Sequence, residues 1–292
     1  MNPTTKKHSS FSKEIYEIIF ILLIVFLIRT FFFGLYQVPT GSMETTMLVG
    51  ERFFADKFTY HFSSPKRSDI ISLNSPLFEY SNNWFKRLFQ EYVWGPDNVT
   101  KRIIGIPGDL VEGKIEDNKP VVYLNGQKLN EPYLNKYPLI ATWKQSSNNQ
   151  KPTIEFKSYD PALPFDRQSF YKIKESQIYK NETGNPYILM PQTLIKELET
   201  KEIPIDQNFW NGTDVFRVKL GAHQYWLMGD NRLGSRDCRD FGPIDGHLIH
   251  GRILFRIMSI DPTDDWLIFD LIKHPIDFWS RVRWNRFFQF LT

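Results

Sequence analysis

An apolar segment close to the start of the chain constrains its fold more than any other feature. Residues 18–38 contain a single charged side chain, Arg29. At about 1.5 Å per residue, a helix of this length reaches roughly 30 Å, the thickness of the hydrocarbon core of a bilayer. The sequence therefore predicts a transmembrane anchor over residues 15–37, preceded by a short polar tail over residues 1–14.

The charges around this segment predict its orientation. Lys6, Lys7 and Lys13 precede the apolar run, and positive residues favour the cytoplasmic side of a membrane. We therefore expect a single-pass protein with a cytoplasmic N-terminus and an extracytoplasmic remainder. A cleavable secretory signal is the alternative, but it requires small residues before the cut, and residues 30–36 are mostly aromatic or bulky.

The rest of the chain predicts a mainly β fold. Pro107-Gly108 suits a type II turn, and Asn125-Gly126 suits a type I′ hairpin. Short apolar or β-branched runs mark the strands that we expect over residues 52–58, 69–73, 99–106, 121–124, 215–218, 224–228 and 253–257.

Composition changes divide this region further. The polar, Asn-, Lys- and Pro-rich residues 136–215 predict an inserted second domain, which leaves two parts of one core, residues 38–135 and 216–260. Residues 75–98 are aromatic and loop-like, so they predict either a local helix folded onto the core or a flap that contacts the membrane. Residues 261–292 form an aromatic and basic tail, expected to pack on the domain or to lie on anionic headgroups.

Charge and cysteine content exclude several classes of protein. A formal net charge of +3 is too small to indicate a nucleic-acid partner. Cys238 is the one cysteine, which excludes an internal disulfide framework and most structural zinc sites. We expect it to be a small buried apolar residue.

Ser42 is the candidate nucleophile, because it follows the anchor directly in Val38-Pro39-Thr40-Gly41-Ser42-Met43. A serine needs a base to take its proton during attack. The histidines lie in no recognisable triad motif, and Thr45 occupies the lysine position of a Ser-x-x-Lys pattern. Lys101 is therefore the candidate base.

Lys101 can act as a base only when it is neutral, which requires burial. Moving its pKa from about 10.4 to near 7 corresponds to roughly 4–5 kcal/mol in favour of the uncharged form. Strand alternation puts Lys101 on one face with Val99 and Ile103, and it predicts that Arg102 points outward.

The loop Gly229 to Gly242 completes the candidate site. It follows a predicted strand and is rich in charged residues and turn formers, as is common in functional loops on rigid scaffolds. The hydroxyl of Ser235 could orient a neutral lysine amine, and Asp237 with Arg239 or Arg232 could brace the loop.

In their order along the chain, these segments closely resemble bacterial type I signal peptidase, the membrane-bound Ser-Lys endopeptidase. The resemblance includes Gly50-Glu51-Arg52 and the ending Arg283-Trp284-Asn285-Arg286, but not the insertion. It implies an extracytoplasmic β-rich Ser-Lys protease fold at the bacterial inner (cytoplasmic) membrane. It also implies that the substrates are signal peptides of exported preproteins, bound as an added strand and cut after small residues of the Ala-x-Ala type.

The resemblance also implies roles for individual residues. Ser42 would be acylated, Lys101 would be the general base, and Ser235 would orient the lysine. No metal or cofactor is implied, and we expect a monomer that contacts membrane lipid and no nucleic acid. The remaining roles are an oxyanion hole made by the backbone N–H of Ser42 and the hydroxyl of Thr40, structural support from Asp230, Asp237 and Arg239, and a shallow substrate pocket lined by Val38, Met47 and Val99.

Two other functions stay open at this point. A self-cleaving repressor-type protease uses the same Ser-Lys dyad, although such proteins are soluble and carry a DNA-binding part. A membrane-anchored binding protein could also keep the fold without catalysis. Substitution of Ser42 and Lys101 separates these possibilities.

Overall fold

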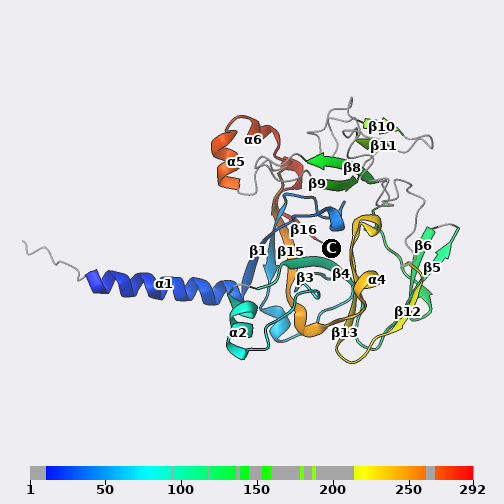
Figure 1. The fold of residues 1–292 in the computed structure, drawn as a ribbon, viewed down its shortest axis with the longest axis horizontal. Helices are drawn as coiled ribbons and strands as arrows, with labels where there is room; N and C mark the ends of the chain where they lie inside the picture. Colours follow the sequence, from blue (N-terminus) through cyan, green and yellow to red (C-terminus); the bar gives the residue numbers. More distant parts are fainter. Residues whose placement is uncertain are drawn as a thin grey trace, which may run out of the picture.

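A β-rich domain with one helix projecting from it makes up the computed structural model (Figure 1). The structure describes residues 11–93, 95–117, 119–135, 139–144, 153–158, 178–180, 186–188, 214–260 and 267–291. Most of the predicted insertion at residues 136–215 lies outside these residues. Inside it, the described strands form two separate pairs, β8 (Leu139–Lys144) with β9 (Thr153–Ser158) and β10 (Ile178–Lys180) with β11 (Pro186–Ile188).

The helix α1 covers Phe11–Phe31 and is followed by strand β1 at Phe33–Gln37. The expected anchor over residues 15–37 is therefore wrong at its C-terminal end, because the apolar run is divided between a helix and a sheet strand that pairs with β2 (Arg52–Asp56). In the part of the chain that the structure describes, no helix is both long enough and apolar enough to cross a membrane.

A large antiparallel sheet forms the body of the domain. Its strands follow the order β1-β2-β15-β3-β4-β13-β14, with β16 paired to β15. Every adjacent pair is antiparallel, and β4 lies between β3 and β13. Besides β1 and β2, the strands of this sheet are β3 (Ile70–Asn74), β4 (Asn98–Gly105), β13 (Gln224–Met228), β14 (Ile244–Asp245), β15 (Ile249–Met258) and β16 (Gln289–Phe290).

A second antiparallel sheet has the order β12-β5-β6-β7. Its strands are β5 (Leu110–Glu116), β6 (Lys119–Leu124), β7 (Gln127–Lys128) and β12 (Phe216–Lys219). Pairing of β12 with β5, and of β13 with β4, joins strands from before and after the insertion.

The turns around these strands follow their predicted chemistry. Gly108 has φ +88°, and the Asp109 N–H donates to the Ile106 carbonyl at 3.0 Å, which closes the turn after β4. Asn125 and Gly126 have φ values of +53° and +82°, as a type I′ hairpin requires. The predicted type I′ turn is confirmed, and so is the positive φ expected at Gly108.

Among the described residues, two of the clusters of buried side chains form the core around the Ser42 segment and the central strands. The larger lies under β3, β4 and β13 and includes Ile71, Ile103, Trp226 and Leu227. The smaller contains Val38, Met43, Met47, Phe53, Ala55, Ile70 and Ile253, so it packs directly beneath the segment that carries Ser42. Burial of Met43 and Met47 fixes that segment on the sheet.

The segment at residues 75–98 contains a helix, α2 (Trp84–Tyr92), which Asn83 caps through its side chain. The helix alternative is therefore correct, but its packing is not the one expected. Trp84 is 72% exposed and Phe85 is 67% exposed, so this helix does not bury its aromatic face in the core.

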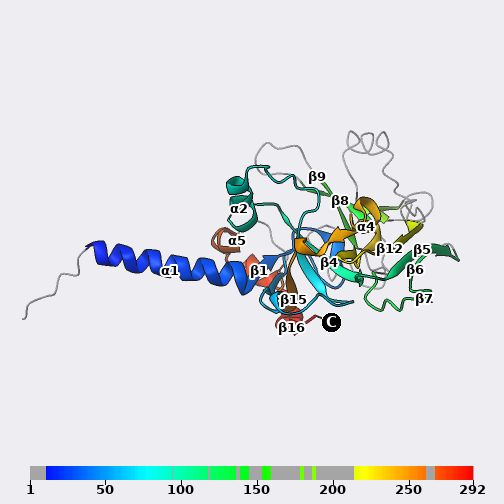
Figure 2. The ribbon, with the colours of Figure 1, turned by 90° about the horizontal axis from the view of Figure 1, so that it is seen from below.

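The tail contains two helices, α5 (Leu267–Lys273) and α6 (Asp277–Ser280). A buried bidentate ion pair between Arg281 and Asp270 joins the end of α6 to α5. The tail packs on the domain, as predicted, through Arg286, which pairs with Glu51, and through Arg283, which donates to the Val49 carbonyl at 3.2 Å. Both views place α2 and α5 on the side of the domain from which α1 projects (Figures 1 and 2).

Candidate active site

Ser42 lies in a short 3-10 turn, η1 (Gly41–Met43), between β1 and β2. Asn231 holds this turn with two hydrogen bonds. Its backbone N–H donates to the Ser42 carbonyl at 3.1 Å, and its side-chain Nδ2 donates to the Gly41 carbonyl at 3.0 Å. Gly229 allows this close approach, because a Cβ there would lie 2.5 Å from the Ser42 carbonyl oxygen and would also meet the Ser235 side chain.

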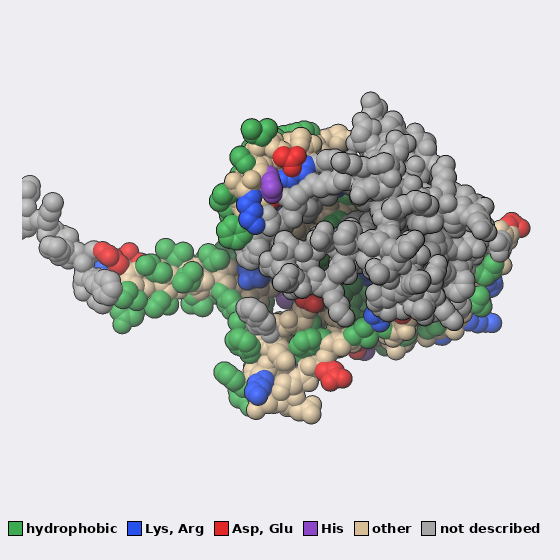
Figure 3. Space-filling model, turned by 45° about the horizontal axis from the view of Figure 1, so that its top comes forward, with side chains coloured by type: hydrophobic (Ala, Val, Ile, Leu, Met, Phe, Trp, Pro, Cys, Tyr) green, Lys and Arg blue, Asp and Glu red, His purple; other side chains and the backbone are tan. Residues whose placement is uncertain are grey.

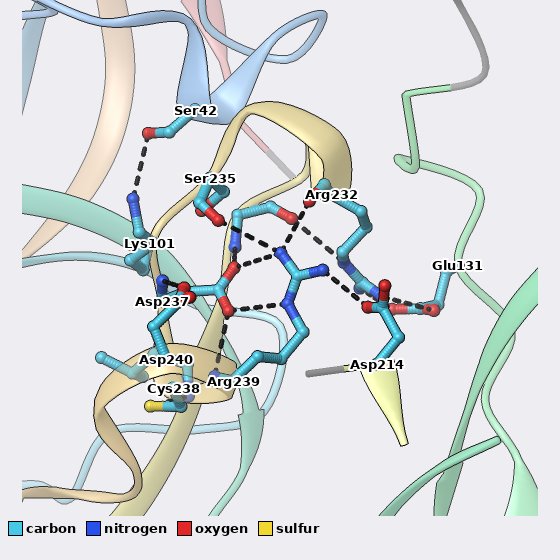
Figure 4. Close-up of polar contacts among 12 residues, drawn as sticks. Ser42, Lys101, Glu131, Asp214, Arg232, Ser235, Asp237, Cys238, Arg239 and Asp240 are labelled. Atoms are coloured by element: carbon cyan, nitrogen blue, oxygen red, sulfur yellow. Dashed lines mark hydrogen bonds and ion pairs between the residues drawn. The ribbon is translucent and has the colours of Figure 1, made fainter. Parts of the chain in front are cut away.

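Lys101 lies on β4 and reaches Ser42 from below the turn (Figure 4). Its Nζ donates a hydrogen bond to Ser42 Oγ at 3.0 Å, and the residue is only 3% exposed. Burial lowers the pKa of Lys101 to about 8; the negative charge of Asp237 opposes the shift, and the positive charge of Arg239 adds to it. The predicted burial of this lysine is confirmed.

Arg102 does not point into solvent, so that prediction is wrong. The residue is 1% exposed, and its Nε and Nη2 donate to the two carboxylate oxygens of Asp230, both at 2.8 Å. Its guanidinium also stacks 3.9 Å from the ring centroid of Tyr133. From Lys101 to Gly105 every residue of β4 is buried, so both faces of this strand are covered and a charge there needs a buried partner.

Asp230 joins the two halves of the site. Beyond its ion pair with Arg102, it accepts a hydrogen bond from Thr46 Oγ1 at 2.5 Å. Because Arg102 is adjacent to Lys101 on β4 and Thr46 follows the Ser42 turn, this carboxylate ties the lysine strand to the serine segment.

Replacing either member of this buried pair is expected to destabilise the protein strongly. Asp230→Asn or Arg102→Met leaves an uncompensated buried group, which costs about 3–5 kcal/mol. The measurement is the free energy of unfolding in denaturant. Lys128→Met is the control, because its ion pair with Glu116 is exposed and worth about 1 kcal/mol or less. Equal small losses for all three variants would contradict this reading.

Asp237 braces the loop from within. It caps the short helix α4 (Cys238–Phe241), accepts from the Gly229 N–H at 3.0 Å and pairs with Arg239 at 2.9 Å. Burial alone would raise the pKa of Asp237, but the hydrogen bonds and charge of Arg239 outweigh it and lower that pKa. The carboxylate is therefore held in its charged form beside Lys101.

Two further acidic residues, which sequence reasoning did not single out, complete the bracing. Asp214 accepts from Arg239 Nη1 at 2.7 Å, and Glu131 pairs with Arg232 in the same loop (Figure 4). Both pairs are buried. Glu131 and Asp214 lie close to the two ends of the insertion. Their ion pairs with Arg232 and Arg239 therefore bind the chain at both ends of the insertion to the loop that faces Ser42.

The other predicted residues lie near Ser42 without forming the expected contacts. Thr40 is exposed, and its Oγ1 lies 3.5 Å from Ser42 Oγ. The Ser235 hydroxyl is buried and has no hydrogen-bond partner among the residues that the structure describes, so the expected bond to Lys101 is absent. Val38 and Met47 are buried in the smaller core cluster, whereas Val99 packs against the larger one.

Cys238 is a buried free thiol, as predicted. Its Sγ accepts a hydrogen bond from the Leu227 N–H at 3.1 Å, and burial raises the pKa of the thiol far above its usual value. In the described part of the chain, no cluster of three or more His, Cys, Asp or Glu side chains could hold a metal ion.

A β-rich domain that brings a half-buried serine to a buried lysine defines a candidate serine hydrolase of the Ser-Lys class. The family model described as "Signal peptidase, peptidase S26" matches residues 12–258. The chain belongs to this family, that of signal peptidase I.

Two individual relatives agree with this assignment by sequence. The chain is 26% identical to Signal peptidase I of Rickettsia akari (strain Hartford), with 99% of this chain and 96% of that protein covered. It is 36% identical to Signal peptidase I P of Bacillus subtilis subsp. natto, over 44% of this chain and 58% of that protein. A crystal structure of a signal peptidase I from Enterococcus faecalis V583 covers 65% of this chain and 97% of its own, with 19% identity and a TM-score of 0.27.

Proposed function

We propose that this protein is a serine endopeptidase that removes signal peptides from exported preproteins, with Ser42 as nucleophile and Lys101 as general base. The observation that carries the proposal is the 3.0 Å hydrogen bond between Lys101 Nζ and Ser42 Oγ, formed by a lysine that burial shifts to a pKa of about 8. A base near neutral pKa is what proton abstraction from serine requires.

The chemistry follows from this pair. Neutral Lys101 accepts the hydroxyl proton as Ser42 Oγ attacks the scissile carbonyl carbon, giving a tetrahedral intermediate. The protonated lysine then donates its proton to the leaving amine as the C–N bond breaks, which leaves an acyl-enzyme on Ser42. Water attacks that ester with Lys101 again accepting the proton, and the proton returns to Ser42 as the new carboxyl product leaves.

The oxyanion of each tetrahedral state needs hydrogen-bond donors. The backbone N–H of Ser42 belongs to the first turn of η1, so it has no partner within that helix. The Thr40 hydroxyl, next to Ser42 Oγ, is the second donor in this proposal. Ser235 is assigned to orient Lys101, because its buried hydroxyl has no partner in the described part of the chain, and buried hydroxyls are nearly always hydrogen-bonded.

Removing the Thr40 hydroxyl is expected to slow turnover. Thr40→Val keeps the shape of the side chain but removes the donor, and loss of one oxyanion donor costs about 10²–10³-fold in kcat. Thr40→Ser is the matched control, since it keeps the hydroxyl and should stay within a few-fold of the parent chain. Peptide cleavage kinetics make the measurement, and a Thr40→Val enzyme with unchanged kcat would remove Thr40 from the oxyanion hole.

Cleavage of a defined peptide tests the function itself. The purified chain should cut a peptide with an Ala-x-Ala recognition segment directly after the second alanine, and it should spare the same peptide with lysine at that position. Depletion in cells should make uncut precursors of exported proteins accumulate. Selection of small residues by Val38, Met47 and Val99 remains a prediction that a peptide series would check.

The membrane setting is also part of this proposal. The side chains from Ile18 to Ile28 on α1 are apolar and 37–62% exposed, so most of this helix surface lacks a partner among the described residues and suits contact with lipid. Placement of the site close to a bilayer fits substrates whose apolar signal segments lie in the membrane. The single-pass topology with a cytoplasmic N-terminus stays a prediction from the flanking lysines.

A further inference from the structure

A cleft of about 690 Å³ lies where α1 meets the domain, and neither Ser42 nor Lys101 lines it. Its walls come from the last turns of α1, the segment after β2, the segment after α2 and the start of β15. The titratable side chains that line it are Arg29, Lys57, Tyr60, His61, Glu91, Asp97, His247 and His250.

Two cations, Arg29 and Lys57, line this cleft and act on each other electrostatically. Lys57 Nζ donates to the backbone carbonyl of Arg29 at 3.1 Å, which places the lysine at the C-terminal turn of α1. Burial lowers the pKa of Lys57, and the positive charge of Arg29 lowers it further. Neither residue forms an ion pair with a described carboxylate, although Glu91 and Asp97 also line the cleft. An anion between these two cations would relieve their repulsion.

Apolar surface continues directly from the polar cleft. Phe26 of α1 and Val93 at the end of α2 line it. Beyond its rim, α1 stays apolar and exposed, and α2 exposes Trp84, Phe85 and Phe89. Basic side chains lie beside the base of the helix, next to this apolar surface (Figure 3). A ligand with an anionic head and apolar chains matches this combination.

We propose that the cleft binds the phosphate of an anionic phospholipid, with Arg29 and Lys57 as its ligands and the acyl chains along α1. The inference rests on the lipid contact proposed for α1 above. It would hold the catalytic domain in one orientation at the bilayer surface, because the headgroup contact is made by the domain and by the helix together.

Co-sedimentation of the full chain with vesicles tests the proposal. The ratio of affinities for phosphatidylglycerol-containing and pure phosphatidylcholine vesicles should fall about thirtyfold in the Arg29→Gln/Lys57→Gln variant, since each cation near an anionic surface contributes about a factor of five. The matched control is Lys114→Gln/Arg217→Gln, which removes one lysine and one arginine from the exposed surface of β5 and β12. The control should change the ratio less than twofold.

Other outcomes would overturn the proposal. An equal loss in the control would mean that only net charge matters. An equal loss on phosphatidylcholine vesicles would mean that the two cations do not select anionic lipid. Stabilisation of the protein by inorganic phosphate that needs Arg29 and Lys57, without any change in vesicle binding, would assign the cleft to free phosphate.

The same variants separate this inference from the proposed enzyme activity. Cleavage of a short soluble peptide without vesicles should be unchanged in Arg29→Gln/Lys57→Gln, because neither residue contacts Ser42 or Lys101. A parent chain that shows the expected lipid selectivity but cuts no peptide would refute the proposed function and leave the lipid site standing.

Discussion

Ser42→Ala is expected to abolish peptide cleavage. Alanine removes the atom that would form the acyl-enzyme, and loss of a serine nucleophile lowers kcat on the order of a million-fold. The backbone of η1 should not change, because Asn231 binds the main chain at Gly41 and Ser42 and does not touch the hydroxyl. The measurement is kcat on an Ala-x-Ala peptide, with circular dichroism to verify the fold.

Two further variants make this result specific. Ser63→Ala removes an exposed hydroxyl that donates to the nearby Thr59 carbonyl, and it should leave kcat unchanged. Because Ser42 and Lys101 act as one unit, the double variant Ser42→Ala/Lys101→Met should lose no more activity than Ser42→Ala alone. Full activity in Ser42→Ala would exclude Ser42 as the nucleophile, whereas a parent chain that cuts no peptide would leave the binding-protein alternative in place.

Local chemistry explains which parts of the fold could be predicted. The turns at Pro107-Gly108 and Asn125-Gly126 depend on φ preferences of the residues themselves, and the structure has positive φ at Gly108, Asn125 and Gly126. The end of the anchor could not be predicted in this way. Its apolar residues after Phe31 suit a membrane helix and a sheet strand equally well, and only pairing with β2 separates the two.

Long-range contacts explain which parts of the site were missed. Ser42 and Lys101 were identified from their motifs, and the fold brings them to 3.0 Å. Alternation predicts an outward Arg102 because it describes a strand with one solvated face, whereas β4 is buried on both faces. Glu131 and Asp214 gave no local signal, because each gains its role only through an arginine of the 229–242 loop far away in the sequence. Asn231 had a signal, its place beside Asp230 in that loop, and side-chain amides are natural partners for backbone carbonyls.

The pH dependence of kcat/KM should report Lys101. Only the neutral amine can accept the serine proton, so activity should rise with pH and level off above the pKa of the lysine. Burial lowers that pKa to about 8, and the midpoint of the rise is therefore expected near pH 8, well below the usual lysine value of about 10.4. Lys101→Met, which keeps most of the apolar length without the amine, should lose activity by at least about 10⁴-fold across the whole range.

The position of the midpoint distinguishes a lysine base from its alternatives. Burial lowers the pKa of His250 to about 4, and an ordinary histidine titrates near 6.5, so a midpoint at either value would point to a histidine base. A midpoint at 10 or above would mean that Lys101 is solvated during catalysis. Thr40→Ser is the internal control, because a change at the oxyanion can alter the rate without moving the midpoint. If the midpoint lies near pH 8, then burial of Lys101 on β4, assisted by the positive charge of Arg239 and opposed by the negative charge of Asp237, makes the neutral amine accessible. That neutral amine is what allows a serine without a histidine partner to act as a nucleophile.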